Sequence, residues 1–410
     1  MPKPGWYRSG TELIREIRET ELPEEILSIW YLGQAGIVVK SGRTVTGIDL
    51  YLRERGPEAL PDGREGHRMR KTGRQMRTLL KLAAFLCCMA LSAAGCGQSV
   101  AEYQAAEAQE AVSGLHFTGP RWEPEQVPAA YLEPAENGGS LETLAYRTKA
   151  YASLGEELEK QAQVYLPPSF DPAGEEQYPL LVLLHGEGGD ETALLGNSET
   201  PSPLKSLLDH MILEKRIPPL IVVTPTYYEG GEHDEIAETA VFYQELLSDL
   251  LPAVEAAYPV FRDGDGLPAR DHRAIGGVSS GAAVTWHLFN RGMAYFSDYL
   301  PLNGVSWAMG ENGGETGPVE TGEFLATTAY KSGFTAKGYR IFTAAAKEEA
   351  HYGAVLAQLD GMKYFPEQFV RTENGFGEGN LLFYEAAAVP PDTTGLCDSL
   401  YNGLRALYGL

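Results

Sequence analysis

Cysteine is scarce in this 410-residue chain, and its shortage excludes two classes of protein. Cys87, Cys88 and Cys96 lie in one apolar segment, which leaves Cys397 as the only cysteine in the larger part of the chain. A disulfide framework is therefore excluded there. No Cys-x-x-Cys pair with distant histidines is present either, so we expect no zinc site and no other metal.

Positive charge is scarce beyond the N-terminal part. Up to Cys96 there are 15 Lys and Arg against 11 Asp and Glu, whereas from Gly97 onward there are 18 against 45. The larger part therefore carries a net charge of about −27. Such a surface repels nucleic acid and anionic membranes. We expect no nucleic-acid partner.

Residues 69–96 have the composition of an export signal. Five Lys and Arg precede an apolar run at 82–91, which leads through small residues to Cys96. This order is that of a signal peptide, and the run is short for a membrane span. The final Ala-Ala-Gly-Cys resembles a bacterial lipobox, which implies an exported lipoprotein anchored to the membrane on its extracellular face through Cys96 only. The alternative is a buried helix, but basic residues stand on one flank alone.

The segments on either side of this signal carry no recognisable chemistry. Residues 97–114 are small, polar and acidic, as expected of a tether. Residues 29–40 followed by 44–51 predict a β-hairpin and resemble the first hairpin of metallo-β-lactamase-fold lactonases. That family's metal-binding histidine cluster is missing, because His67 stands alone. We expect residues 1–68 to be a truncated, non-functional fragment.

Residues 115–410 alternate strands with helices. Apolar runs at 180–184 and 220–224 are typical of buried parallel strands, and the apolar spacing at 204–213 and 241–257 predicts covering helices. Further strands are predicted at 161–166, 274–276, 299–303, 340–345 and 381–386. The pattern predicts a three-layer α/β sandwich around a mostly parallel sheet.

The segment Gly277-Val278-Ser279-Ser280-Gly281 has the form of a nucleophile elbow. It follows a short strand and precedes a helix that begins near Gly281. Glycine is required two residues before and after the serine, because the sharp turn crowds strand and helix together. The segment predicts Ser279 as a nucleophile, and the alternative is an ordinary glycine-rich turn.

A second glycine-rich segment, residues 185–190, directly follows the strand at 180–184. In an elbow of this kind, a backbone N–H from such a loop and the N–H of the residue after the nucleophile form the oxyanion hole. The donors are therefore expected to be Ser280 and either Glu187 or Gly188. We expect His185 to support the loop rather than act in catalysis.

Several of these segments together resemble the feruloyl and acetyl-xylan esterases of plant-cell-wall degradation, which share the α/β-hydrolase fold with enterochelin and S-formylglutathione esterases. The resemblance runs from about residue 146 to the C-terminus and is carried, besides the elbow, by 164–167, 183–186, 223–225, 271–274, 296–307 and 339–352. It implies a serine hydrolase that forms an acyl-enzyme at Ser279 and needs no cofactor. The implied substrate is an ester of a plant-cell-wall carbohydrate or another small ester.

The resemblance places the catalytic acid after the strand that ends near Ala345. Glu349 occupies that place, with Glu348 as the alternative. A glutamate is able to orient a histidine in this fold. A pair of glutamates on a surface loop is also an ordinary feature.

The base is missing from its usual place. The family has its histidine in the loop after the last strand, here 386–395, and this loop contains none, since His351 is the last histidine. Without a base, Ser279 remains a poor nucleophile. Three hypotheses follow: His351 serves as a displaced base, Asp392 is a weak substitute, or the domain is a degenerate esterase that binds carbohydrate or a protein partner at the cell surface.

Two aromatic residues are candidates for substrate binding. Trp307 follows the strand after the elbow, where strand ends border a site, and Tyr227 lies near the expected cleft. Residues 310–322 predict an acidic loop beside the site that is placed to act as a lid. We expect His272 and His287 to be structural.

If residues 69–96 are an export signal, the exported protein begins at or near Cys96. Edman sequencing or peptide mass spectrometry of the exported form is expected to find no peptide from the first 60 residues. Recovery of such a peptide from the mature protein contradicts the expectation.

Overall fold

The computed structural model contains two compact units, Met1–Gly95 and Cys96–Leu410. The described residues are 27–31, 36–41, 44–49, 117, 121–168, 170–231, 233–264, 269–387 and 393–409. Within these ranges no helix combines the length and the apolar composition needed to cross a membrane. The predicted export signal, the tether, Cys96 and Asp392 lie outside the described residues.

The N-terminal unit contains a small antiparallel sheet. Its strands, in the order β1-β2-β3, are Leu27–Tyr31, Gly36–Ser41 and Thr44–Asp49. In place of the predicted hairpin, the structure has a three-stranded sheet, in which β2 pairs with β1 on one side and with β3 on the other.

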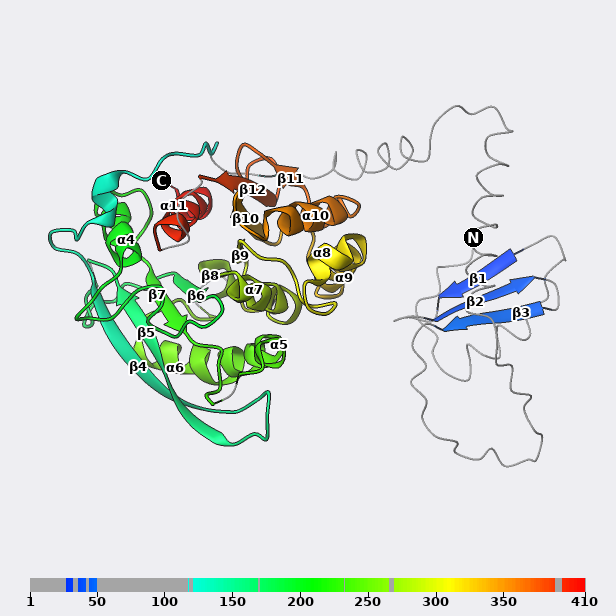
Figure 1. The fold of residues 1–410 in the computed structure, drawn as a ribbon, viewed down its shortest axis with the longest axis horizontal. Helices are drawn as coiled ribbons and strands as arrows, with labels where there is room; N and C mark the ends of the chain where they lie inside the picture. The colour runs from blue at the N-terminus through cyan, green and yellow to red at the C-terminus, as the bar shows by residue number, and fades with distance from the viewer. Residues whose placement is uncertain are drawn as a thin grey trace. The chain divides into compact units, whose positions relative to one another are not determined.

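The C-terminal unit is built on one nine-stranded sheet (Figure 1). Its order is β11-β12-β10-β9-β8-β6-β7-β5-β4. Strand β4, at one edge of the sheet, runs antiparallel to β5, and β5 runs antiparallel to β7. The pairs from β7 to β11 are parallel. The strands are β4 (Ser140–Lys149), β5 (Glu157–Leu166), β6 (Leu180–Leu184), β7 (Ile221–Pro225), β8 (Arg273–Val278), β9 (Asp298–Leu302), β10 (Arg340–Ala346), β11 (Arg371–Thr372) and β12 (Leu381–Ala386).

Helices cover both faces of this sheet, so the predicted three-layer α/β sandwich is confirmed. Successive residues of β6 alternate between the two cores: Leu180 and Val182 pack on one face and Leu181 and Leu183 on the other. The first core is shared with α5 (Glu235–Glu245), α6 (Leu251–Ala257), α7 (Ser280–Arg291), α9 (Pro318–Lys331) and α10 (Tyr352–Met362). The second is shared with α4 (Pro203–Leu213) and α11 (Thr393–Tyr408), which lie together in Figure 1.

Two predicted segments differ in detail from the structure. The single helix expected at 241–257 is α5, one π-helical turn at Leu246–Leu250 and then α6. The acidic loop expected at 310–322 is partly helical, because α8 (Gly313–Thr316) lies within it and α9 begins at Pro318. Both differences arise because apolar spacing alone does not separate α- from π-helical turns or mark short helices.

Glycines allow the elbow to form where β8 meets α7. A Cβ on Gly277 would lie 2.4 Å from the carbonyl oxygen of Gly281. A Cβ on Gly281 would lie 2.4 Å from the carbonyl oxygen of His185 and 2.5 Å from that of Leu184. Backbone on both sides of the turn therefore excludes a side chain, as the sequence predicted.

Because rigid backbone surrounds it, Gly281→Ala is expected to lower the free energy of unfolding by about 1 to 3 kcal/mol. The matched control is Gly353→Ala on α10, where a Cβ would meet nothing within 4 Å. We expect that control to leave stability unchanged or raise it by up to about 1 kcal/mol. Urea unfolding of the three proteins measures the difference, and equal midpoints would contradict the steric account.

Candidate active site

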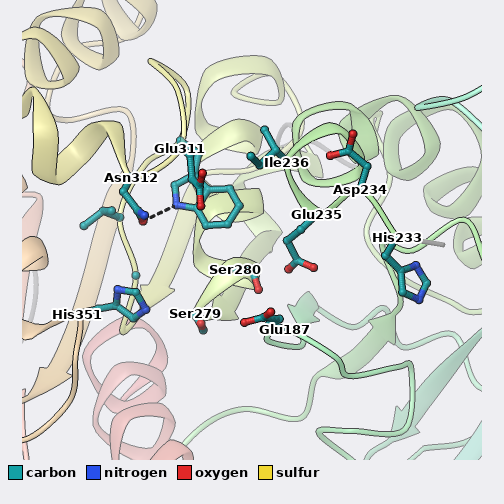
Figure 2. Close-up of a pocket in the computed structure, with 13 residues that line it drawn as sticks. Glu187, His233, Asp234, Glu235, Ile236, Ser279, Ser280, Glu311, Asn312 and His351 are labelled. Carbon is teal, nitrogen blue, oxygen red and sulfur yellow. Dashed lines mark hydrogen bonds between the residues drawn. The ribbon is translucent and has the colours of Figure 1, made fainter.

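A pocket of about 540 Å³ opens over the elbow. Its walls come from the segments that follow the carboxyl ends of the parallel strands, the usual place for a site in an open α/β sheet. Glu187 follows β6, Ser279 follows β8, Trp307 follows β9 and His351 follows β10. In Figure 2, Ser279 and Ser280 lie between His351 on one side and Glu187 and Glu235 on the other.

Ser279 has the strained backbone of an elbow nucleophile. Its φ of 56° and ψ of −120° are unusual for any residue with a side chain. The turn is held by the Ser279 N–H, which donates to the carbonyl of Leu302 at 3.0 Å. Backbone also crowds the far side, since a Cβ on Gly304 would lie 2.5 Å from the Ser279 carbonyl oxygen. The strained turn therefore places Ser279 in the lining of the pocket.

The predicted oxyanion donors lie in the backbone around the elbow. Ser280 begins α7, so its N–H is not used within the helix, and the helix dipole favours negative charge there. The Gly188 N–H already donates to the Tyr228 hydroxyl at 2.9 Å. The Glu187 N–H makes no hydrogen bond in the described part of the chain, and its residue lines the pocket. Of the two alternatives, the geometry favours Glu187 over Gly188.

His185 supports the glycine-rich loop at 185–190 from the buried side. The side chain is buried, and its ring stacks on Tyr227 with the centroids 4.4 Å apart. One ring nitrogen lies 2.7 Å from the Gly186 carbonyl and the other 2.9 Å from the Thr226 hydroxyl. Burial lowers the pKa of His185, so the ring is held neutral. Both nitrogens are thus occupied in supporting the loop.

Among the described residues, no hydrogen bond joins the candidate acid Glu349 to a histidine. The Glu349 carboxylate accepts a hydrogen bond at 3.1 Å from the N–H of Ala346, in its own turn, and Glu348 is exposed on the surface. His351 is the N-cap residue of α10 and lines the pocket. No hydrogen bond joins Ser279 Oγ to an imidazole among the residues that the structure describes. The loop at 386–395 is only partly described, and Asp392 is not among its described residues.

The two aromatic candidates lie in different places. Trp307 is half-buried and lines the pocket, and its indole N–H donates to Asn312 at 3.1 Å. Tyr227 has 1% of its side chain exposed and does not line the pocket. The expectation that Tyr227 binds substrate is therefore corrected: this ring lies beneath the site.

Glu235 is a site residue that the sequence did not indicate. Glu235 lines the pocket from the first turn of α5, and its carboxylate accepts hydrogen bonds from the hydroxyls of Tyr227 and Tyr228. A glutamate after the helix cap Asp234 is an ordinary helix start, so no local pattern separates it from a structural residue. Only the fold brings these side chains together.

Comparison with known proteins shows what the chain resembles. Residues 153–298 match the family model described as "Putative esterase". Endo-1,4-beta-xylanase Y of Acetivibrio thermocellus is 30% identical over 264 residues, which is 63% of this chain and 22% of the xylanase. The matched region thus spans about a fifth of that longer relative. The predicted resemblance to the esterase family is confirmed.

Solved structures agree with this result. An alanine mutant of a feruloyl esterase module from Clostridium thermocellum, complexed with sinapinate, is 26% identical, with a TM-score of 0.59, over 72% of this chain and 96% of the module. An S-formylglutathione hydrolase from Staphylococcus aureus is 15% identical, with a TM-score of 0.44, over 69% of this chain and 99% of that protein. The similarity to the feruloyl esterase module confirms the α/β-hydrolase class predicted from the sequence.

His287 lies on α7 behind the elbow and is 8% exposed. Burial, with a smaller contribution from nearby Arg291, lowers the pKa of His287 to about 4. The ring is therefore neutral at pH 7 and packs as a structural residue. In the described ranges no group of three or more His, Cys, Asp or Glu side chains is arranged to hold a metal ion.

The depressed pKa of His287 makes stability depend on pH. Unfolding frees the ring to protonate at its ordinary pKa of 6.5, so its contribution is complete above pH 6.5 and is lost as the pH falls towards 4. Over that window the wild type is expected to lose about 3 kcal/mol more than His287→Gln. Urea unfolding at pH 7 and pH 4 measures both proteins, and parallel pH profiles would contradict the assignment.

Proposed function

We propose that the C-terminal domain is a serine carboxylesterase of the feruloyl or acetyl-xylan type that acts on carbohydrate-linked esters. The observation that carries the proposal is the strained Ser279 at the base of a pocket, with the N–H groups of Ser280 and Glu187 beside it. Ser279 Oγ attacks the ester carbonyl, and these donors stabilise the resulting oxyanion. The alcohol then leaves, and water hydrolyses the acyl-enzyme to release the acid.

His351 is the base in this proposal. It lines the same pocket as Ser279, from the segment after β10 rather than after β12. It takes the Ser279 proton as the new bond forms and gives it to the departing alcohol. Glu349 is hydrogen-bonded to Ala346, and within the described ranges no carboxylate is hydrogen-bonded to His351, so we expect turnover below that of a complete triad.

The pocket lining supports a neutral substrate. Ile236, Val305 and Trp307 offer apolar surface for an acyl group or a sugar ring, while the charged residues that line the pocket are acidic. No Lys or Arg belongs to the pocket lining in the described part of the chain. The xylanase and feruloyl esterase similarity supports a plant-cell-wall ester.

A second candidate function is a degenerate esterase domain that binds carbohydrate or a protein partner without turnover. It is favoured by one observation: within the described residues Ser279 Oγ has no hydrogen-bonded imidazole.

For either function we propose an exported domain that is anchored outside the cell through lipid on Cys96. The basic, apolar and small-residue order of 69–96 supports that location.

A fluorophosphonate probe and p-nitrophenyl acetate separate the two functions. We expect the wild type to be labelled and to turn over, and Ser279→Ala to lose both, because the probe bonds to the nucleophile. Ser332→Ala, at the exposed end of α9, is the matched serine control and is expected to behave as the wild type. His351→Gln is expected to lower kcat by about 100-fold.

Other outcomes identify the alternative. A folded wild type that is neither labelled nor active would support the degenerate domain and refute the esterase. Labelling that survives in Ser279→Ala would refute Ser279 as the nucleophile. Full activity in His351→Gln would remove His351 as the base.

A further inference from the structure

The carboxylate of Glu235 is the meeting point of two hydrogen-bond chains beneath the pocket. One oxygen accepts from the Tyr227 hydroxyl at 3.0 Å, and the other accepts from the Tyr228 hydroxyl. Both tyrosine side chains are buried, with 1% and 7% exposed. Burial raises the pKa of each, so both hydroxyls keep the proton that they donate.

The Tyr228 chain leads to the loop after β6. The Tyr228 oxygen, whose proton is donated to Glu235, accepts a hydrogen bond at 2.9 Å from the Gly188 N–H. This bond fixes the backbone one residue after Glu187, whose own N–H is left for an oxyanion. His233 stacks on the Tyr228 ring, with the centroids 4.0 Å apart, and limits its movement.

The Tyr227 chain leads to the elbow. The Tyr227 oxygen lies 3.1 Å from the Ser280 hydroxyl oxygen. A carboxylate only accepts, and Tyr227 has one hydroxyl proton, so that proton belongs to the bond with Glu235. The Ser280 hydroxyl therefore supplies the proton of the second bond. This contact fixes Ser280, whose backbone N–H is the other oxyanion donor, at the start of α7.

Glu235 is well placed to hold both chains. It lies in the first turn of α5, where the helix dipole favours a negative charge, and α5 packs against α7. Hydrogen bonds to a charged acceptor are stronger than those between neutral groups. One carboxylate thus ties together two segments that are about 90 residues apart in the sequence.

We propose that Glu235 is the positioning residue of the oxyanion hole, and that it sets the distance between the Glu187 and Ser280 donors through Tyr228 and Tyr227. The proposal rests on the proposed esterase function. Glu235 acts through the tyrosines and touches no reacting atom. Its effect therefore belongs to transition-state stabilisation rather than to substrate binding.

The first experiment measures p-nitrophenyl acetate turnover. Glu235→Ala is expected to lower kcat by about 10- to 100-fold and to change KM by less than about threefold. Glu235→Gln is expected to give an intermediate kcat, because its amide oxygen still accepts one bond. Glu320→Ala is the matched control: it removes an exposed carboxylate from the first turn of α9 and is expected to keep the wild-type kcat.

Non-additivity separates positioning from a general loss of structure. If Glu235 acts through the two tyrosines, adding Tyr227→Phe and Tyr228→Phe to Glu235→Ala is expected to cost less than about twofold further in kcat. The proposal is overturned if the losses in kcat add in full. It is also overturned if the kcat of Glu235→Ala lies within about twofold of the wild type.

A second measurement does not require turnover. Amide hydrogen exchange at Gly188 is expected to be about tenfold faster in Glu235→Ala and Tyr228→Phe, and unchanged in Glu320→Ala. Unchanged exchange in the first two variants overturns the proposal. Faster exchange in a protein whose wild type shows neither labelling nor turnover would refute the esterase function and still support the role of Glu235 in holding the loop.

Discussion

The close approach of bare backbone at the elbow is the constraint on which the site depends. The end of strand β6, strand β8, helix α7 and the segment after β9 meet at distances that exclude a Cβ on Gly277, Gly281 or Gly304. The close packing of these segments holds Ser279 at a positive φ. This conformation is unfavourable in isolation and is stabilised by the surrounding fold. The nucleophile position is therefore a property of packing around the serine rather than of the serine itself.

Beyond that contact, the site is assembled by electrostatics. In the proposed site, the loop after β6 and the start of α7 each provide an N–H for developing negative charge, and a single carboxylate on α5 accepts hydrogen bonds from tyrosines that reach both. Donors held before the reaction cost no reorganisation when the charge appears. Sterics thus place the nucleophile, and hydrogen bonds from a third segment place its donors.

The sequence was informative where burial was complete. The strand at 180–184 was predicted with its bounds as observed, since a strand buried in a parallel sheet is a continuous apolar run. Strand β4 was missed because it is an edge strand with many exposed polar residues. The elbow has a local pattern, whereas the link from Glu235 to Tyr227 and Tyr228 exists only after folding. Tyr227 was predicted to bind substrate because it is an aromatic residue near the expected cleft, but its ring is buried beneath the site.

The acidic lining of the pocket would affect the release of an acidic reaction product. Ester hydrolysis converts a neutral substrate into a carboxylic acid that is ionised at neutral pH. Glu187, Asp234, Glu235 and Glu311 all line the pocket, so the newly formed anion would face like charge on several walls. Departure of the acid would be driven by repulsion, and the reverse reaction would be disfavoured by the same walls.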